Sequence, residues 1–102
     1  MAIQVVNKKQ FKGEGIYIGR PSVLGNPFAI GRDGDREEVI ARYRAWLWDQ
    51  VKARNEVFAE LLKIKAMAER GEVCLICWCK PLACHGDVVK ACVEWMIQEG
   101  IG

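Results

Sequence analysis

Residues 73–79 read VCLICWC, an uninterrupted apolar run of seven residues that ends two positions before Pro81. A short apolar run of this kind is typical of a strand that is buried on both faces of a sheet. It predicts the central strand of the fold. Because side chains alternate between the two faces of a strand, Cys77 and Cys79 are expected on one face and Cys74 on the other.

Two amphipathic segments precede this strand. Residues 35–38, DREE, have the pattern of a capping box, and apolar residues follow at steps of three and four, which predicts a helix over residues 36–52. The pattern slips near Asn55 and resumes up to Gly71, a residue type that often follows the end of a helix. The segment therefore holds two helices with a break near Asn55.

Two short strands open the chain and a helix closes it. Residues 3–7, IQVVN, and residues 15–19, GIYIG, predict strands, and residues 86–100 predict a helix. The order β, β, α, α, β, α predicts an α/β fold. We expect one small Rossmann-like sandwich, with about three strands and three to four helices, as a single domain over residues 1–102. Loops at the carboxyl ends of the strands are expected to form the site.

The composition narrows the class of protein. Hydrophobic residues make up 51% of the 102 residues and charged residues 27%, which is typical of a globular domain, and the net charge of +2 gives little attraction to nucleic acid. No apolar run reaches the roughly 20 residues that span a bilayer, and the N-terminus lacks the apolar core of a signal peptide. We expect a cytoplasmic protein that uses neither a membrane nor nucleic acid as a partner, with reduced cysteines.

Residues 77–87, CWCKPLACHGD, gather three of the five cysteines and the only histidine of the chain. One interpretation is a zinc site. Three thiolates and one imidazole, from Cys77, Cys79, Cys84 and His85, form the ligand set of a closed tetrahedral site. The spacing argues against it, because it differs from the usual pairs of C-x2-C.

Two further interpretations of the same stretch stay open. In one, Cys84, His85, Gly86 and Asp87 form the first turn of the last helix, where backbone N–H groups and the helix dipole bind an anion and lower the pKa of a thiol. An enzyme built there would use Cys84 or Cys79 as nucleophile, with His85 as base. In the structural alternative, Asp87 caps the helix, His85 bonds a backbone carbonyl group and the cysteines pack in the core.

The loop GRPSVLGNPF, which starts at Gly19, is rich in glycine and proline. Gly19 and Gly25 allow backbone amides to approach a ligand, and Arg20 offers a fork for a phosphate or a carboxylate. The loop matches neither the Rossmann nor the Walker phosphate motif, and an Ω-loop stiffened by its prolines is the structural alternative. The candidate ligand-binding residues of this loop are Gly19, Arg20, Pro21, Ser22, Gly25 and Asn26.

The stretches IGRPSVLGNPFAIGRDGDREEVI and LICWCKPLACHGDVV resemble a small family of domains of unknown function from bacteria and bacteriophages. That family carries a G-R-P-S-x-L-G-N-P-F loop and a C-W-C-x-P-x-x-C-H-G/A-D turn, and the resemblance spans nearly the whole chain. It implies a single α/β domain whose signature is the two motifs. The occurrence of the family in phages implies a counter-defence role, in which the domain sequesters a signal derived from NAD or ADP-ribose.

A pocket shared by the two motifs is the first functional hypothesis. It would bind a nucleotide-type small molecule, with one phosphate at the glycine-rich loop, a second phosphate or the sugar at residues 84–87, and the base near Trp78 or Tyr17. No cofactor is needed for this function.

Two other functions remain as alternatives. One is a Cys/His enzyme that acts on a nucleotide or nucleoside, with Cys84, His85 and Asp87 as its catalytic residues. The other is an interaction module that zinc stabilises and that presents Trp48 and Trp95 to a partner. Four tryptophans and several amphipathic helices compete for one small core, which favours a homo-oligomer.

Overall fold

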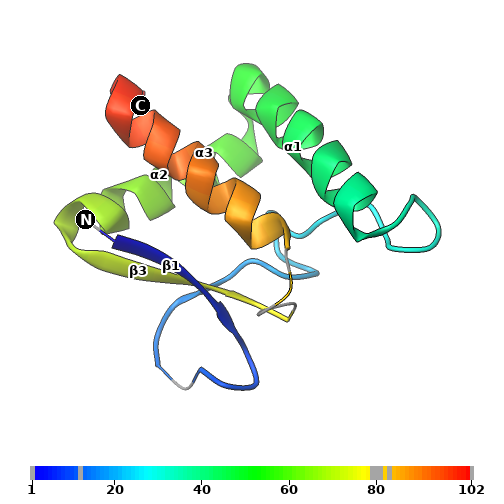
Figure 1. Cartoon of the computed structure of the whole chain (residues 1–102). Coiled ribbons are helices and arrows are strands. Elements are labelled where there is room, and N and C mark those ends of the chain that lie inside the picture. Colours follow the sequence, from blue (N-terminus) through cyan, green and yellow to red (C-terminus); the bar gives the residue numbers. More distant parts are fainter. Residues whose placement is uncertain (1, 12, 79–81, 83, 102) are drawn as a thin grey trace.

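The computed structural model describes residues 2–11, 13–78, 82 and 84–101. These residues form six elements, in the order β1 (Ala2–Asn7), β2 (Ile16–Tyr17), α1 (Arg36–Ala53), α2 (Glu56–Arg70), β3 (Glu72–Cys77) and α3 (His85–Glu99). The strands form one parallel sheet in the order β1-β3-β2, with the three helices on one side of it (Figure 1). The predicted α/β class, the order of the elements and the central place of β3 are confirmed.

The side chains of β3 alternate between buried and half-buried positions. Val73, Leu75 and Cys77 face the helices and are at most 3% exposed, whereas Cys74 lies on the opposite face and is half-buried. The expectation of a strand buried on both faces was therefore wrong. An apolar run does not tell how many helical layers cover a sheet, and here no described helix covers the second face. Cys79, predicted inside this strand, lies outside the described residues.

The two predicted helices before β3 are present, with the break where the pattern slips. Asp35 Oδ1 accepts a hydrogen bond from Glu38 N at 2.9 Å, and Glu38 Oε1 accepts one from Asp35 N at 3.0 Å, which completes the capping box of α1. Arg54 takes a left-handed conformation with φ of 51°, and the Asn55 side chain then caps α2 by accepting from Val57 N at 3.0 Å. Local capping thus starts one helix and separates it from the next.

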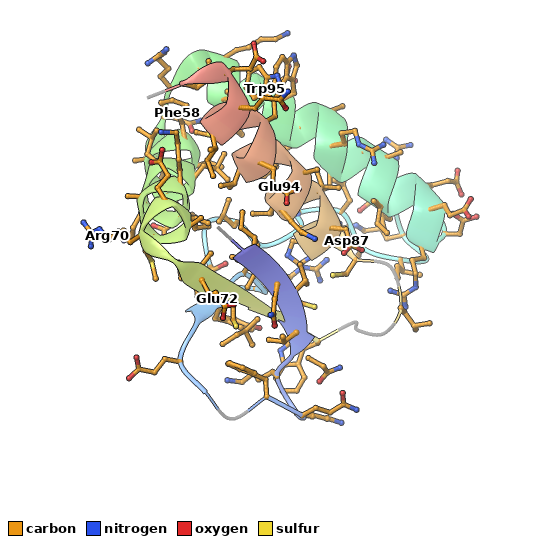
Figure 2. All side chains as sticks on the ribbon, turned by 60° about the vertical axis from the view of Figure 1, so that its left-hand side comes forward. Phe58, Arg70, Glu72, Asp87, Glu94 and Trp95 are labelled. Carbon is orange, nitrogen blue, oxygen red and sulfur yellow. The ribbon has the colours of Figure 1, made fainter. Side chains whose placement is uncertain are left out.

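The helices form the second layer of the fold. In Figure 2, α3 runs between α1 and α2, and it also packs on β1 and β3. The long segment between β2 and α1 is tied to α1 by Tyr43, whose hydroxyl donates to Leu24 O at 2.7 Å inside the core. In the part of the chain that the structure describes, none of the helices has the length and apolar character to cross a membrane.

Candidate functional site

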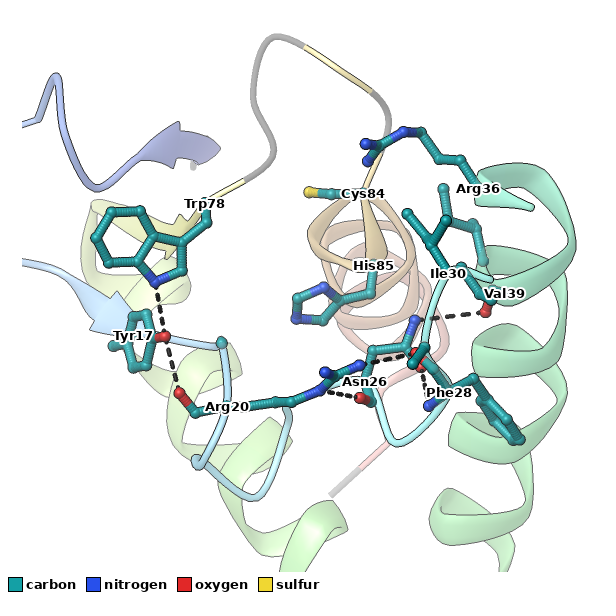
Figure 3. Close-up of a pocket in the computed structure, with 13 residues that line it drawn as sticks. Tyr17, Arg20, Asn26, Phe28, Ile30, Arg36, Val39, Trp78, Cys84 and His85 are labelled. Carbon is teal, nitrogen blue, oxygen red and sulfur yellow. Dashed lines mark hydrogen bonds between the residues drawn. The ribbon is translucent and has the colours of Figure 1, made fainter. Parts of the chain in front are cut away.

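A cavity of about 490 Å³ opens at the carboxyl ends of β2 and β3 (Figure 3). Gly19 and Arg20 line it from the loop after β2, and Cys84 and His85 line it from the first turn of α3. Residues of both motif stretches, such as Arg20 and Cys84, which are 64 positions apart (84 − 20) in the sequence, therefore lie around one cavity. This edge of a parallel sheet is the one where α/β proteins bind their ligands.

Arg20 lies along the cavity and also braces its own loop. Its Nε donates to Asn26 O at 2.8 Å, and its Nη2 donates to Phe28 O at 2.9 Å. A guanidinium has five N–H groups, and the other three form no hydrogen bond with the described residues. The planar head is thus fixed in place while part of its donor capacity stays available.

Asn26 lines the cavity, but its side-chain amide bonds to backbone groups of the protein. Its Oδ1 accepts from Phe28 N at 2.9 Å, and its Nδ2 lies 3.4 Å from Val39 O on α1. Both ends of the amide therefore hold the loop against α1.

Arg36, the first residue of α1, supplies a second guanidinium to the lining. In Figure 3 it lies on the side of the cavity opposite Arg20. Sequence analysis missed it, because Arg36 belongs to neither motif. Among the described residues that line the cavity, none carries a carboxylate. The two guanidinium groups bring positive charge to the lining, which favours an anionic ligand.

An aromatic pair forms one rim of the cavity. Trp78 Nε1 donates to the Tyr17 hydroxyl at 2.9 Å, and this hydroxyl donates to Arg20 O at 2.9 Å. Lys8, just after β1, places its Nζ 5.3 Å from the Tyr17 ring centroid and 5.9 Å from that of Trp78. Trp78 remains 48% exposed.

The cysteine and histidine at the start of α3 make internal contacts. Cys84 Sγ lies 3.3 Å from Cys77 Sγ, and both residues are at most 2% exposed. Burial, together with the contact to Cys77, raises the pKa of the Cys84 thiol to about 12.

His85 Nε2 lies 2.6 Å from Ile18 O. Because a carbonyl oxygen only accepts, we assign the ring proton to Nε2. Burial is the main cause that lowers the pKa of His85, so the ring is neutral near pH 7. Asp87 Oδ2 accepts from Cys84 N at 3.2 Å. The structural alternative for this stretch therefore matches the contacts of all three residues.

The enzymatic alternative needs a thiol next to a base. In the described residues the Cys84 thiol contacts Cys77, and no hydrogen bond joins it to the His85 ring. Catalysis by Cys84, His85 and Asp87 stays a prediction, without support from this arrangement.

The zinc alternative also stays a prediction. Cys79, one of its four ligands, lies outside the described residues. The His85 Nε2 atom is engaged with Ile18 O, and the ranges that the structure describes hold no group of three or more His, Cys, Asp or Glu residues placed for a metal ion.

The remaining candidate residues shape the surroundings of the cavity and do not line it. The list comprises Pro21, Ser22, Gly25, Gly86 and Asp87. A Cβ atom on Gly25 would lie 3.1 Å from Ser22 O, and one on Gly86 would lie 2.7 Å from Val5 Cγ1. A side chain at position 86 would therefore displace its neighbours, and one at position 25 would make a tight contact with the backbone of its own loop.

The fold and the cavity define a class of protein: a small parallel α/β domain with a positively charged, aromatic-rimmed cavity at the carboxyl edge of its sheet. Residues 3–95 match the model of the family described as Domain of unknown function (DUF4326). The match covers most of the chain, so the chain belongs to this family, which confirms the resemblance drawn from its two motifs. No curated protein and no solved structure matches the chain.

Proposed function

We propose that this domain binds a small phosphate-containing, nucleotide-type ligand in the cavity between the GRPSVLGNPF loop and the start of α3. The observation that carries the proposal is the lining itself: two guanidinium groups, aromatic rings at one rim and no carboxylate among the described lining residues. The volume of about 490 Å³ lies in the range of ordinary small-molecule sites.

The phosphate groups belong with the two arginines. Arg20 is held by Asn26 O and Phe28 O before any ligand arrives, so its side chain loses little freedom on binding. A guanidinium matches the oxygen geometry of a phosphate better than an ammonium does. Arg36 supplies a second positive charge from another element, which suits a ligand with more than one anionic oxygen group.

Binding without turnover is the activity that these contacts favour. The buried thiol of Cys84, with a pKa of about 12, is a poor nucleophile near pH 7. The domain would then sequester its ligand, and nucleotides derived from NAD or ADP-ribose are members of the class to test.

Isothermal titration with ADP and ADP-ribose tests the proposal, with Arg36→Gln as the variant. Loss of a charge-assisted contact to a phosphate is expected to weaken binding about tenfold or more. Arg44→Gln is the matched control, because Arg44 is an exposed arginine of the same helix that does not line the cavity. Equal affinities of the two variants, or no binding of either nucleotide by the unmodified protein, would overturn the proposal.

A further inference from the structure

The polar atoms of the aromatic pair are already in use. The indole N–H of Trp78 donates to the Tyr17 hydroxyl, and this hydroxyl donates to Arg20 O. Neither ring therefore has a donor left for the edge of a ligand. The pair can therefore contact a ligand only with the faces of its rings. Trp78 is the more exposed of the two residues.

The other lining side chains provide few hydrogen-bonding groups for the edge of a base. The His85 ring is 8% exposed, and its Nε2 is bonded to Ile18 O. Phe28, Ile30 and Val39 are apolar residues of the lining, and both ends of the Asn26 amide are engaged with backbone atoms. The two arginines are assigned to phosphate. Hydrogen-bonded readout of a particular base needs donors and acceptors in fixed positions, and the described side chains of this rim do not supply them.

Lys8 fixes the pair from outside the cavity. Its Nζ lies over both rings, and Lys8 is absent from the cavity lining. Its backbone N also donates to Cys77 O at 2.8 Å, which continues the pairing of β1 with β3. The rings are thus held by a hydrogen bond to each other and by a cation, and both residues line the cavity.

We infer that the domain recognises its ligand as a purine nucleotide, by stacking the base on Trp78 and Tyr17 without reading its edge. This inference rests on the proposed function and specifies the class of base. Stacking strength grows with the area of the ring system, so purines bind more tightly than pyrimidines. Because edge contacts are lacking, adenine and guanine bind about equally.

The test keeps the phosphates constant and varies the base. Titrations with ADP, GDP, UDP and inorganic pyrophosphate are expected to give ADP and GDP affinities within about threefold of each other. Pyrophosphate should bind at least about tenfold more weakly than ADP, since one base stacked on an aromatic ring contributes roughly that factor. UDP should lie between them.

Variants of Trp78 identify the rings as the source of the preference. Trp78→Leu should weaken the binding of ADP at least about fivefold and leave the binding of pyrophosphate unchanged. Trp78→Phe keeps a ring face, so it should lose less of the affinity for ADP. Trp48→Leu removes another exposed tryptophan, on α1 and outside the cavity lining, and should change neither.

Each outcome separates this inference from the proposed function. Recognition by stacking would be overturned by any of three results: equal affinities for ADP and pyrophosphate, an unchanged affinity of Trp78→Leu for ADP, or a tenfold difference in affinity between ADP and GDP. Each of these results would leave the proposed phosphate site in place. No binding of any of the four probes would overturn both.

Discussion

Tyr43→Phe removes a single oxygen atom from the core and tests how the loop above the cavity is held. Tyr43 has no exposed surface, and its hydroxyl donates to Leu24 O at 2.7 Å, across 19 positions of sequence. Leu24 is itself 1% exposed, so water has no ready access to the carbonyl oxygen that the substitution leaves behind. An unsatisfied buried acceptor costs about 1–3 kcal/mol of the free energy of unfolding.

Urea denaturation followed by circular dichroism measures this cost. With a slope of about 1–3 kcal/mol per molar urea, typical of small proteins, the midpoint should fall by about 1 M at unchanged slope. The variant should also bind ADP more weakly, because the same hydrogen bond ties the segment between β2 and α1 to the helix that carries Arg36.

Tyr17→Phe is the matched control for the same chemical change. The Tyr17 hydroxyl also donates to a carbonyl group, Arg20 O, and it accepts from Trp78 Nε1. Tyr17 is half-buried, and Arg20 and Trp78 are exposed, so water can replace the lost group at both partners. We expect a cost below about 1 kcal/mol. Equal costs for the two variants, or a cost below about 0.5 kcal/mol for Tyr43→Phe, would refute the argument that burial of the acceptor sets the size of the effect.

Two further predictions follow from titratable groups at the start of α3. The pKa of His85 is lowered by burial, so below its ordinary value of about 6.5 the unfolded chain binds a proton that the folded chain does not, and the free energy of unfolding falls as the pH falls. From pH 7 to pH 5 the free energy of unfolding in urea should therefore fall more steeply for the unmodified protein than for the His85→Asn variant. The two slopes should differ by at most about 1.4 kcal/mol per pH unit. Equal slopes for the two proteins would contradict this expectation. Iodoacetamide near pH 8 should leave Cys84, with its pKa of about 12, unmodified in the native protein and modify it in concentrated guanidinium chloride, as peptide mass spectrometry would show. Rapid native modification of Cys84 would instead support a catalytic thiol.

Elements with local signals were predictable from the sequence. The capping pair Asp35 and Glu38 marks the start of α1, and Asn55 marks the start of α2, because each cap is formed by residues within three positions of each other. The exposure of the second sheet face was not predictable, since Cys74 is as apolar as its buried neighbours. How many layers cover a strand depends on where distant helices pack.

The candidate site was predictable in outline and less so in the role of each side chain. Residue types alone place Arg20 and Asn26 among ligand contacts. The Asn26 side chain instead bonds Phe28 N, two positions away, and Val39 O, which the packing of the loop on α1 brings near. Lys8 and Arg36 were missed because they belong to no motif. A usable signal was present for Lys8: it directly follows β1, just as Trp78 directly follows β3 at the same edge of the sheet.

The two motifs are joined to each other by the protein itself. His85 Nε2 bonds Ile18 O, which links the first turn of α3 to the segment after β2, and Arg20 closes its own loop through Phe28 O. These contacts join protein groups only, so the chain itself shapes the walls of the cavity. A preformed site loses little conformational entropy when it takes its ligand. Under the proposed function, the polar side chains that bond to other protein groups are the frame of the site, and contact with the ligand is assigned to Arg20, Arg36 and the rings of Trp78 and Tyr17.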